Sequence, residues 1–104
     1  MSQAEESQLR VYRIADGHLP DFLAEWRAGV LPLRQKFGFQ IEAWTDVAES
    51  TFVWVVRYGG PGTLEDADRA YYASPEREAL LPDPARWIVD SITLTLEPIT
   101  DDSP

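Results

Sequence analysis

A chain of 104 residues is long enough for one domain, and its formal net charge of −9, without any cluster of Lys and Arg, argues against nucleic acid and anionic membrane surfaces as partners. The absence of cysteine excludes disulfide bonds and thiolate metal sites. The first residues, MSQAEES, are polar and acidic, and no apolar run is long enough to span a membrane, so the sequence predicts a cytoplasmic location.

The first predicted elements are a strand at 8–14 and a helix that begins near Pro20. Before the strand, we expect a disordered tail at 1–7. Apolar residues recur at helical spacing along the helix, namely Phe22, Trp26, Val30, Leu33 and Phe37. Pro32 lies within this pattern and predicts a kink or a division of the helix in two, whereas Gly38 predicts its end.

Two strands follow at 39–47 and 51–58, and the short turn between them predicts a hairpin. The second strand is the most apolar segment of the chain and is rich in β-branched and aromatic residues. Its alternation places Phe52, Trp54, Val56 and Tyr58 on one face and Thr51, Val53, Val55 and Arg57 on the other. Both faces are mostly apolar, so we expect both to be covered.

The second helical region begins after a break at GGPG. Thr63 and Asp66 have the spacing of a capping box and predict the start of a helix that buries Leu64, Ala67 and Tyr71. Ser74 and Pro75 predict a second helix start. We expect Arg77, just after it, to join this helix to its neighbour or to a dimer mate.

The chain ends with a short turn capped by Asp83, a strand at 88–97 and a disordered acidic tail at 98–104, so the folded domain is 8–97. The order of elements is therefore βαββαβ. This order predicts a ferredoxin-like α+β fold with a four-stranded antiparallel sheet in the order 4-1-3-2. Both helices then cover the same face, and the apolar character of the other face predicts a homodimer packed sheet to sheet.

Several segments resemble the NIPSNAP family, which belongs to the dimeric α/β-barrel superfamily. They span residues 9–97 and are VYRIADGHLPDFLAEWRAGVLPLRQKFGF, WTD, FVWVVRYGGPGTLEDADRAYYASPER and DPARWI. The resemblance implies a homodimer whose two sheets close into a barrel. Relatives in the wider superfamily include cofactor-free antibiotic-biosynthesis monooxygenases and haem-degrading monooxygenases. The latter pair a His with an Asn, and this sequence contains no Asn, which argues against haem chemistry. We expect no cofactor.

His18 is the only histidine, and it lies between the first strand and the first helix, at a strand end where ligands often enter. A histidine in this place is a candidate catalytic base, since its pKa can be tuned near neutral pH. The alternative is an exposed loop residue without a catalytic role. No cluster of metal ligands appears in the sequence, so we expect no metal site.

Arg13 and Arg57 lie late in two strands that should be neighbours at the centre of the sheet. Each shares a strand face with β-branched residues, and a buried guanidinium needs an acidic partner or an anionic ligand. If both point into a cavity, they could hold a carboxylate or a phenolate. The alternative is a structural ion pair, for example with Glu42 or Asp90.

The aromatic residues could form the walls of a pocket for a flat aromatic molecule. Core packing explains Trp26 and Tyr71, which fall on the apolar stripes of their helices. Trp44 and Tyr72 are better pocket candidates, because each falls outside the main apolar stripe of its element, and Trp54 is a further candidate.

We therefore predict a NIPSNAP-like homodimer that binds a small, flat, largely apolar molecule between the sheet and the helices. One alternative is a cofactor-independent monooxygenase, with His18 as the base and an arginine to stabilise the anion. A second alternative is a structural or protein-interaction module with a filled cavity. An enzyme requires a cavity with a titratable group inside, a binding protein requires a cavity without one, and an interaction module requires neither.

Overall fold

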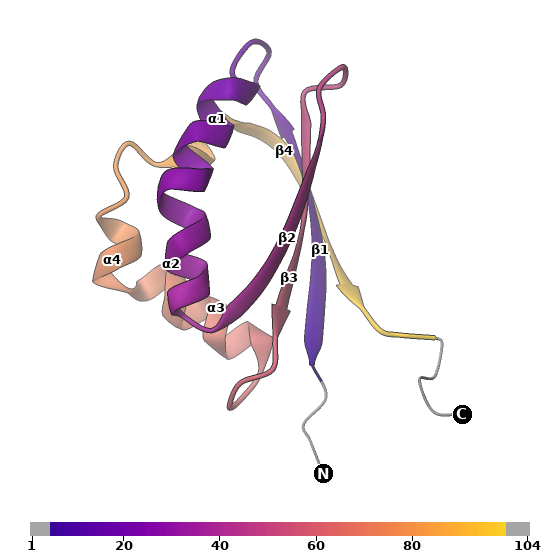
Figure 1. The fold of residues 1–104 in the computed structure, drawn as a ribbon, viewed down its shortest axis with the longest axis vertical. Coiled ribbons are helices and arrows are strands. Elements are labelled where there is room, and N and C mark those ends of the chain that lie inside the picture. Colours follow the sequence, from indigo (N-terminus) through magenta and orange to yellow (C-terminus); the bar gives the residue numbers. More distant parts are fainter. Residues whose placement is uncertain (1–4, 100–104) are drawn as a thin grey trace.

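One antiparallel sheet of four strands organises the computed structural model, which describes residues 5–99 (Figure 1). The strands are β1 (Glu6–Ile14), β2 (Phe39–Asp46), β3 (Thr51–Tyr58) and β4 (Ile88–Leu96). Their order across the sheet is β2-β3-β1-β4, which is the predicted order read from the opposite edge. The ferredoxin-like α+β fold is thereby confirmed.

The first helical region is divided at Pro32, as predicted. It consists of α1 (Leu19–Glu25), the π-helical turn η1 (Trp26–Val30) and α2 (Leu31–Lys36). Proline has no N–H and its ring crowds the preceding turn, so an ordinary helix cannot continue through it. The wide turn ends where the Leu31 N–H donates to the Trp26 carbonyl, five residues back. Gly38, with φ of +92°, follows the end of α2.

The second helical region consists of α3 (Leu64–Ala73), α4 (Pro75–Glu78) and the 3₁₀ turn η2 (Pro84–Trp87). Each of the three starts at a side-chain cap that the sequence predicts. Thr63 accepts a hydrogen bond from the Asp66 N–H, Ser74 accepts one from Arg77, and Asp83 accepts one from Ala85. These caps fix the places at which the chain turns above the sheet.

All the helices lie on one face of the sheet, and the core fills the space between (Figure 1). β3 turns Phe52, Trp54 and Val56 toward the helices, where all three are buried. The helices contribute Phe22, Trp26, Val30, Leu33, Leu64 and Tyr71 to the same cluster. This face of the sheet is therefore the one on which a buried site can form.

The opposite face of the sheet, which we call the outer face, carries no helix in the described part of the chain. Strand register places two apolar rows across it. One row is Ile92, Val11, Val53 and Trp44, and the other begins with Leu94, Leu9 and Val55. Ile92, Leu94 and Trp44 are about half exposed or more.

The predicted tails fall largely outside the described residues, which begin at Glu5 and end at Ile99. One boundary differs from the prediction, because Glu6 and Ser7 pair with β3 and so extend β1 into the predicted tail. Within the described range, no helix is both long and apolar enough to cross a membrane. The cytoplasmic location stays a prediction.

Candidate functional site

A small cavity of about 40 Å³ lies between the sheet and the helices, and aromatic side chains form most of its wall. Eight elements contribute to it, so that residues far apart in the sequence meet there. The lining residues are Tyr12, Phe22, Trp26, Val30, Trp54, Tyr71, Tyr72, Arg77, Pro84, Ala85 and Ile88. We call this space the aromatic cavity.

The two indoles of the aromatic cavity pack edge to face. The ring centroids of Trp26 and Trp54 are 5.6 Å apart with an interplanar angle of 89°, and Tyr12 lies 6.1 Å from Trp54 in a similar arrangement. Trp26 belongs to the wide turn before Pro32, so the irregular helix supplies part of this wall. Edge-to-face contacts of this kind hold ring positions firmly.

Several polar atoms on lining residues are buried without a hydrogen-bond partner in the described part of the chain. They are the indole Nε1 of Trp26 and of Trp54, the hydroxyl of Tyr71 and the Nε of Arg77. Two of these groups still lie beside another polar group without a hydrogen bond of normal geometry. Trp54 Nε1 is beside the Tyr12 hydroxyl, and the Tyr71 hydroxyl is beside the Arg34 guanidinium. A buried polar group without a partner costs on the order of 1–3 kcal/mol, so such groups call for an explanation.

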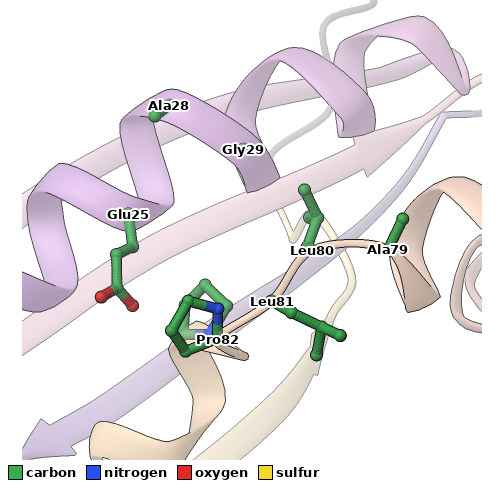
Figure 2. A pocket seen from close by; sticks show the side chains of 8 residues that line it. Glu25, Ala28, Gly29, Ala79, Leu80, Leu81 and Pro82 are labelled. Atoms are coloured by element: carbon green, nitrogen blue, oxygen red, sulfur yellow. The ribbon is translucent and has the colours of Figure 1, made fainter.

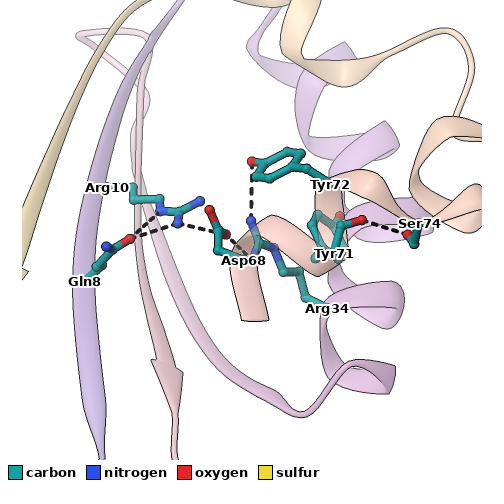
Figure 3. A network of polar contacts seen from close by, with 7 residues as sticks. All are labelled: Gln8, Arg10, Arg34, Asp68, Tyr71, Tyr72 and Ser74. Carbon is teal, nitrogen blue, oxygen red and sulfur yellow. Dashed lines mark hydrogen bonds and ion pairs between the residues drawn. The ribbon is translucent and has the colours of Figure 1, made fainter. Parts of the chain in front are cut away.

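A buried ionic network lies beside the aromatic cavity (Figure 3). Arg10 Nη2 and Arg34 Nη1 both donate to Oδ1 of Asp68, at 3.0 and 2.7 Å. Arg34 is fully buried, and its guanidinium lies 3.9 Å from the ring centroid of Tyr71. Arg34 Nη2 also donates to the Tyr72 hydroxyl at 3.3 Å. The network thus holds two guanidinium groups on one carboxylate, next to both tyrosines.

Burial and neighbouring charges shift the pKa values of the ionisable groups in this region in opposite directions. Burial would lower the pKa of Arg10, but the nearby Asp68 carboxylate outweighs it and raises that pKa above its usual value. Burial raises the pKa of Tyr12 and of Tyr71, because a phenolate is poorly solvated there. At neutral pH the arginine is therefore charged and these two tyrosines are protonated.

Arg77 closes one side of the aromatic cavity and pairs with Asp83, with 3.0 Å between Nη2 and Oδ1. Its guanidinium also lies 5.5 Å from the ring centroid of Tyr72. Burial alone would raise the pKa of Asp83, but the hydrogen bonds from Ala85 and Arg77 outweigh it and lower that pKa. Arg77 therefore joins α4 to the turn before η2, within one chain.

The lowered pKa of Asp83 predicts a pH dependence of stability. A carboxyl with a lower pKa in the folded state stabilises the fold above its unfolded pKa, and this contribution is lost as the pH falls through the folded pKa. We expect Asp83→Asn to be destabilised relative to the parent at pH 7, and the difference to shrink below about pH 4. Urea denaturation of both proteins between pH 7 and 3 measures it, and a constant difference would contradict this role of Asp83.

The structure brings together two of the residues that the sequence singles out as ligand contacts. Trp54 and Tyr72 both line the aromatic cavity, where Trp54 is buried and Tyr72 is 45% exposed. Trp44 lies elsewhere, in an open groove at the edge strand β2 that Leu23, Arg27 and other residues line. It does not reach the aromatic cavity.

Arg13 and Arg57 both lie on the outer face, away from the aromatic cavity. Along its strand, each arginine alternates with neighbours that face the helices. Arg57 forms an ion pair with Glu42 of β2, and this pair is the one that the structural alternative named. Arg13 is exposed and lies across from Asp90 of β4. The two arginines therefore flank the apolar rows of the outer face.

His18 lies at the start of α1 and does not line the aromatic cavity. Its ring stacks on Trp87 with 4.0 Å between ring centroids, and its Nδ1 is 3.0 Å from Oδ2 of Asp21. The side chain is 42% exposed. His18 therefore lies outside the aromatic cavity, between Trp87 and Asp21, and a catalytic role for it stays a prediction.

The ionic network contains three residues that sequence analysis did not select, namely Arg10, Arg34 and Asp68. A signal was present in the sequence. Arg34 continues the apolar stripe of Trp26 and Val30 at helical spacing, and Asp68 falls on the apolar stripe of Leu64 and Tyr71. A charged residue on an apolar stripe indicates a buried partner. Nothing local indicates which residue that partner is.

A larger cavity of about 260 Å³ lies between η1 and the segment around Leu80 (Figure 2). Its walls are mostly apolar, and Leu80 approaches Gly29 so closely that a Cβ there would lie 3.0 Å from the Leu80 side chain. The one charged lining residue, Glu25, already accepts two hydrogen bonds from Arg86. This groove therefore offers no free polar group to orient a ligand.

The chain resembles several solved structures over nearly its whole length. An uncharacterised NIPSNAP domain protein from Burkholderia xenovorans has a TM-score of 0.80 at 20% identity and covers 95% of this chain and 98% of its own. A NIPSNAP family protein from Agrobacterium tumefaciens has a TM-score of 0.81 at 19% identity, and the match covers 99% of this chain and 92% of that protein. An antibiotic biosynthesis monooxygenase has a TM-score of 0.69 at 15% identity, and the match covers 91% of this chain and 99% of that protein.

These likenesses confirm that the chain has the fold of NIPSNAP family proteins, as the resemblance in sequence implied. At such low identity they establish the fold alone. No family model and no curated protein matches the sequence.

Proposed function

We propose that the protein is a NIPSNAP-like homodimer that binds a small, flat, aromatic molecule in the aromatic cavity of each protomer. One observation carries this proposal: six aromatic rings from several elements line one small cavity, and four of its lining residues hold a buried polar atom without a partner among the described residues. Ligand sites typically combine apolar walls with a few convergent polar groups.

Tyr72 is the side chain that admits the ligand. The cavity, at about 40 Å³, is smaller than an aromatic ring, so a ligand must displace part of its wall. Tyr72 is half exposed, and its hydroxyl is held by Arg34 at 3.3 Å, which is long for a hydrogen bond. An outward rotation of this side chain would widen the aromatic cavity without disturbing the buried Trp54 and Tyr71.

The outer face is the proposed dimer surface. Its apolar centre contains Val11, Val53 and Leu94, while the ion pair of Arg57 and Glu42 lies at its border. An apolar centre with a polar rim is the usual organisation of a protein interface. A two-fold dimer would bury this same surface of both copies.

Binding is better supported than catalysis. A cofactor-independent monooxygenase needs a base in its pocket, and His18 does not line the aromatic cavity. Of the lining tyrosines, Tyr12 and Tyr71 have raised pKa values and are therefore poor bases at neutral pH. The interaction-module alternative requires no ligand in the cavity, and the experiment below separates it from the proposal.

Fluorescence anisotropy of 2-naphthol, excited beyond the absorption of tryptophan, tests the proposal. We expect a saturable rise with the parent protein and none with Ala85→Leu, because Ala85 lines the aromatic cavity and a larger side chain fills it. Ala79→Leu is the matched control, since Ala79 lines the separate groove of Figure 2 and should leave binding unchanged. Absence of a saturable rise with the folded parent would overturn the proposal.

A further inference from the structure

The edge strand β2 has one side of its backbone unpaired. In the described part of the chain, β2 pairs with β3 alone, in a continuous register from Phe39 to Asp46. Every second residue of an edge strand in an antiparallel sheet directs its N–H and C=O away from the neighbouring strand. Such edges are commonly protected by lysine, proline or a bulge. The eight residues of β2 contain none of these, so the edge is open to another strand.

A groove of about 430 Å³ lies between β2 and the first helical region. Ala43 and Thr45 face the helices on this part of the strand, and their side chains are too small to fill the space. Leu23 and Leu31 form the opposite wall, and the buried Phe52 also lines the groove. A strand added to β2 would direct every second side chain into this groove.

Arg27 gives the groove a positive charge. It lines the groove, it is exposed, and it takes part in none of the ion pairs found in the described part of the chain. This is notable in a chain with 18 acidic and 9 basic residues. Glu42 and Asp46 of β2 lie on the outer face, because they alternate with the residues that face the helices. The helix side of this edge is therefore apolar and basic.

We propose that β2 binds an extended segment of a partner protein as an added strand, with apolar side chains in the groove and an acidic side chain beside Arg27. Main-chain hydrogen bonds along the edge supply the affinity, and the groove and Arg27 supply the selectivity. The other edge strand, β4, is exposed on both faces after Ile88, so no helix forms a wall beside it. The groove lies on the helix side of β2, so this inference depends neither on the outer face nor on the aromatic cavity.

A peptide with alternate N-methyl groups separates strand addition from simple apolar contact. The probe is acetyl-EVLVTVE-amide, and calorimetry measures its binding. N-methylation of its valines, or instead of its leucine and threonine, removes N–H donors from opposite sides of the added strand. We expect one of these two peptides to lose about tenfold or more in affinity, because its methyl groups face β2, and the other to bind like the unmodified probe. Equal affinities of the two would overturn strand addition.

Charge reversal at Arg27 tests the acidic side chain of the partner. At about 0.15 M salt, which screens distant charges, we expect the parent to bind EVLVTVE about fivefold more tightly than KVLVTVK. Arg27→Glu should reverse this preference, and because the side chain is exposed the fold should be retained. Arg13→Glu is the matched control, since Arg13 is exposed on the outer face, and it should keep the preference of the parent. An unchanged preference in Arg27→Glu would overturn the acidic assignment.

Amide hydrogen exchange locates the added strand. The amides of β2 that point away from β3 should exchange quickly in the free protein and slowly with EVLVTVE bound, while those of β4 stay unchanged. Slowing at β4 instead of β2, or no binding of EVLVTVE at all, would overturn the proposal. Slow exchange of these β2 amides in the free protein would also overturn it, because a second copy of the chain would then cover the edge.

Discussion

Replacing Asp68 with alanine is expected to lower the free energy of unfolding by about 3 kcal/mol, the lower end of the cost of breaking a buried ion pair. Among residues 5–99, Asp68 is the one carboxylate that pairs with Arg10 and Arg34, which are 5% and 0% exposed. Without it, two guanidinium groups remain buried without a counter-charge. We take the lower end because Asp68 is one-quarter exposed, so water can partly replace it.

The matched control is Asp66→Ala, two positions away in the same helix. Asp66 is exposed, and its ion pair is with the exposed Arg69 at the surface, so its loss should cost less than about 1 kcal/mol. Thermal denaturation measures both, and for a domain of this size Asp68→Ala should lower Tm by about 12 °C or more. Similar Tm values for the two variants would show that the buried network contributes little.

Leu94→Asp is expected to convert the proposed dimer to a monomer at micromolar concentration. Leu94 is 48% exposed in the single chain, so a carboxylate there costs the protomer little. In a symmetric dimer across the outer face, the substitution places two unpaired charges in an apolar interface, each at a cost of several kcal/mol. The dissociation constant should therefore rise by about a thousandfold or more.

Thr95→Asp is the control for this substitution, because Thr95 lies next to Leu94 on the same strand but points to the other face. Light scattering coupled to size-exclusion chromatography gives the mass of each variant. We expect a dimer for the parent and for Thr95→Asp and a monomer for Leu94→Asp. A Leu94→Asp dimer as stable as that of the parent would exclude the outer face as the interface.

Local sequence signals predicted the architecture well. The caps at Thr63, Ser74 and Asp83 are each made by one side chain and a backbone N–H two or three residues away, so a short stretch of sequence contains the whole interaction. The division of the first helix at Pro32 is local for the same reason. The form it takes, a wide turn that orients Trp26, depends on packing against the sheet and could not be anticipated.

The candidate site was harder to predict because its contacts join distant parts of the chain. Arg10 and Asp68 are 58 positions apart, and only the folded sheet and α3 bring them together. Alternation showed that Arg57 shares a strand face with Val53 and Val55 and that Trp54 lies on the other face. It could not show which face the helices cover, since both faces of β3 are apolar, and that choice decides whether Trp54 or Arg57 reaches the aromatic cavity.

Native mass spectrometry of the freshly purified protein tests the account most directly, because one spectrum reports both the oligomeric state and any bound ligand. We predict a mass of two chains plus a small adduct that is released on denaturation, with the adduct absent from Ala85→Leu. A mass of one chain without an adduct would contradict the account, because neither the covered outer face nor the occupied aromatic cavity would then exist.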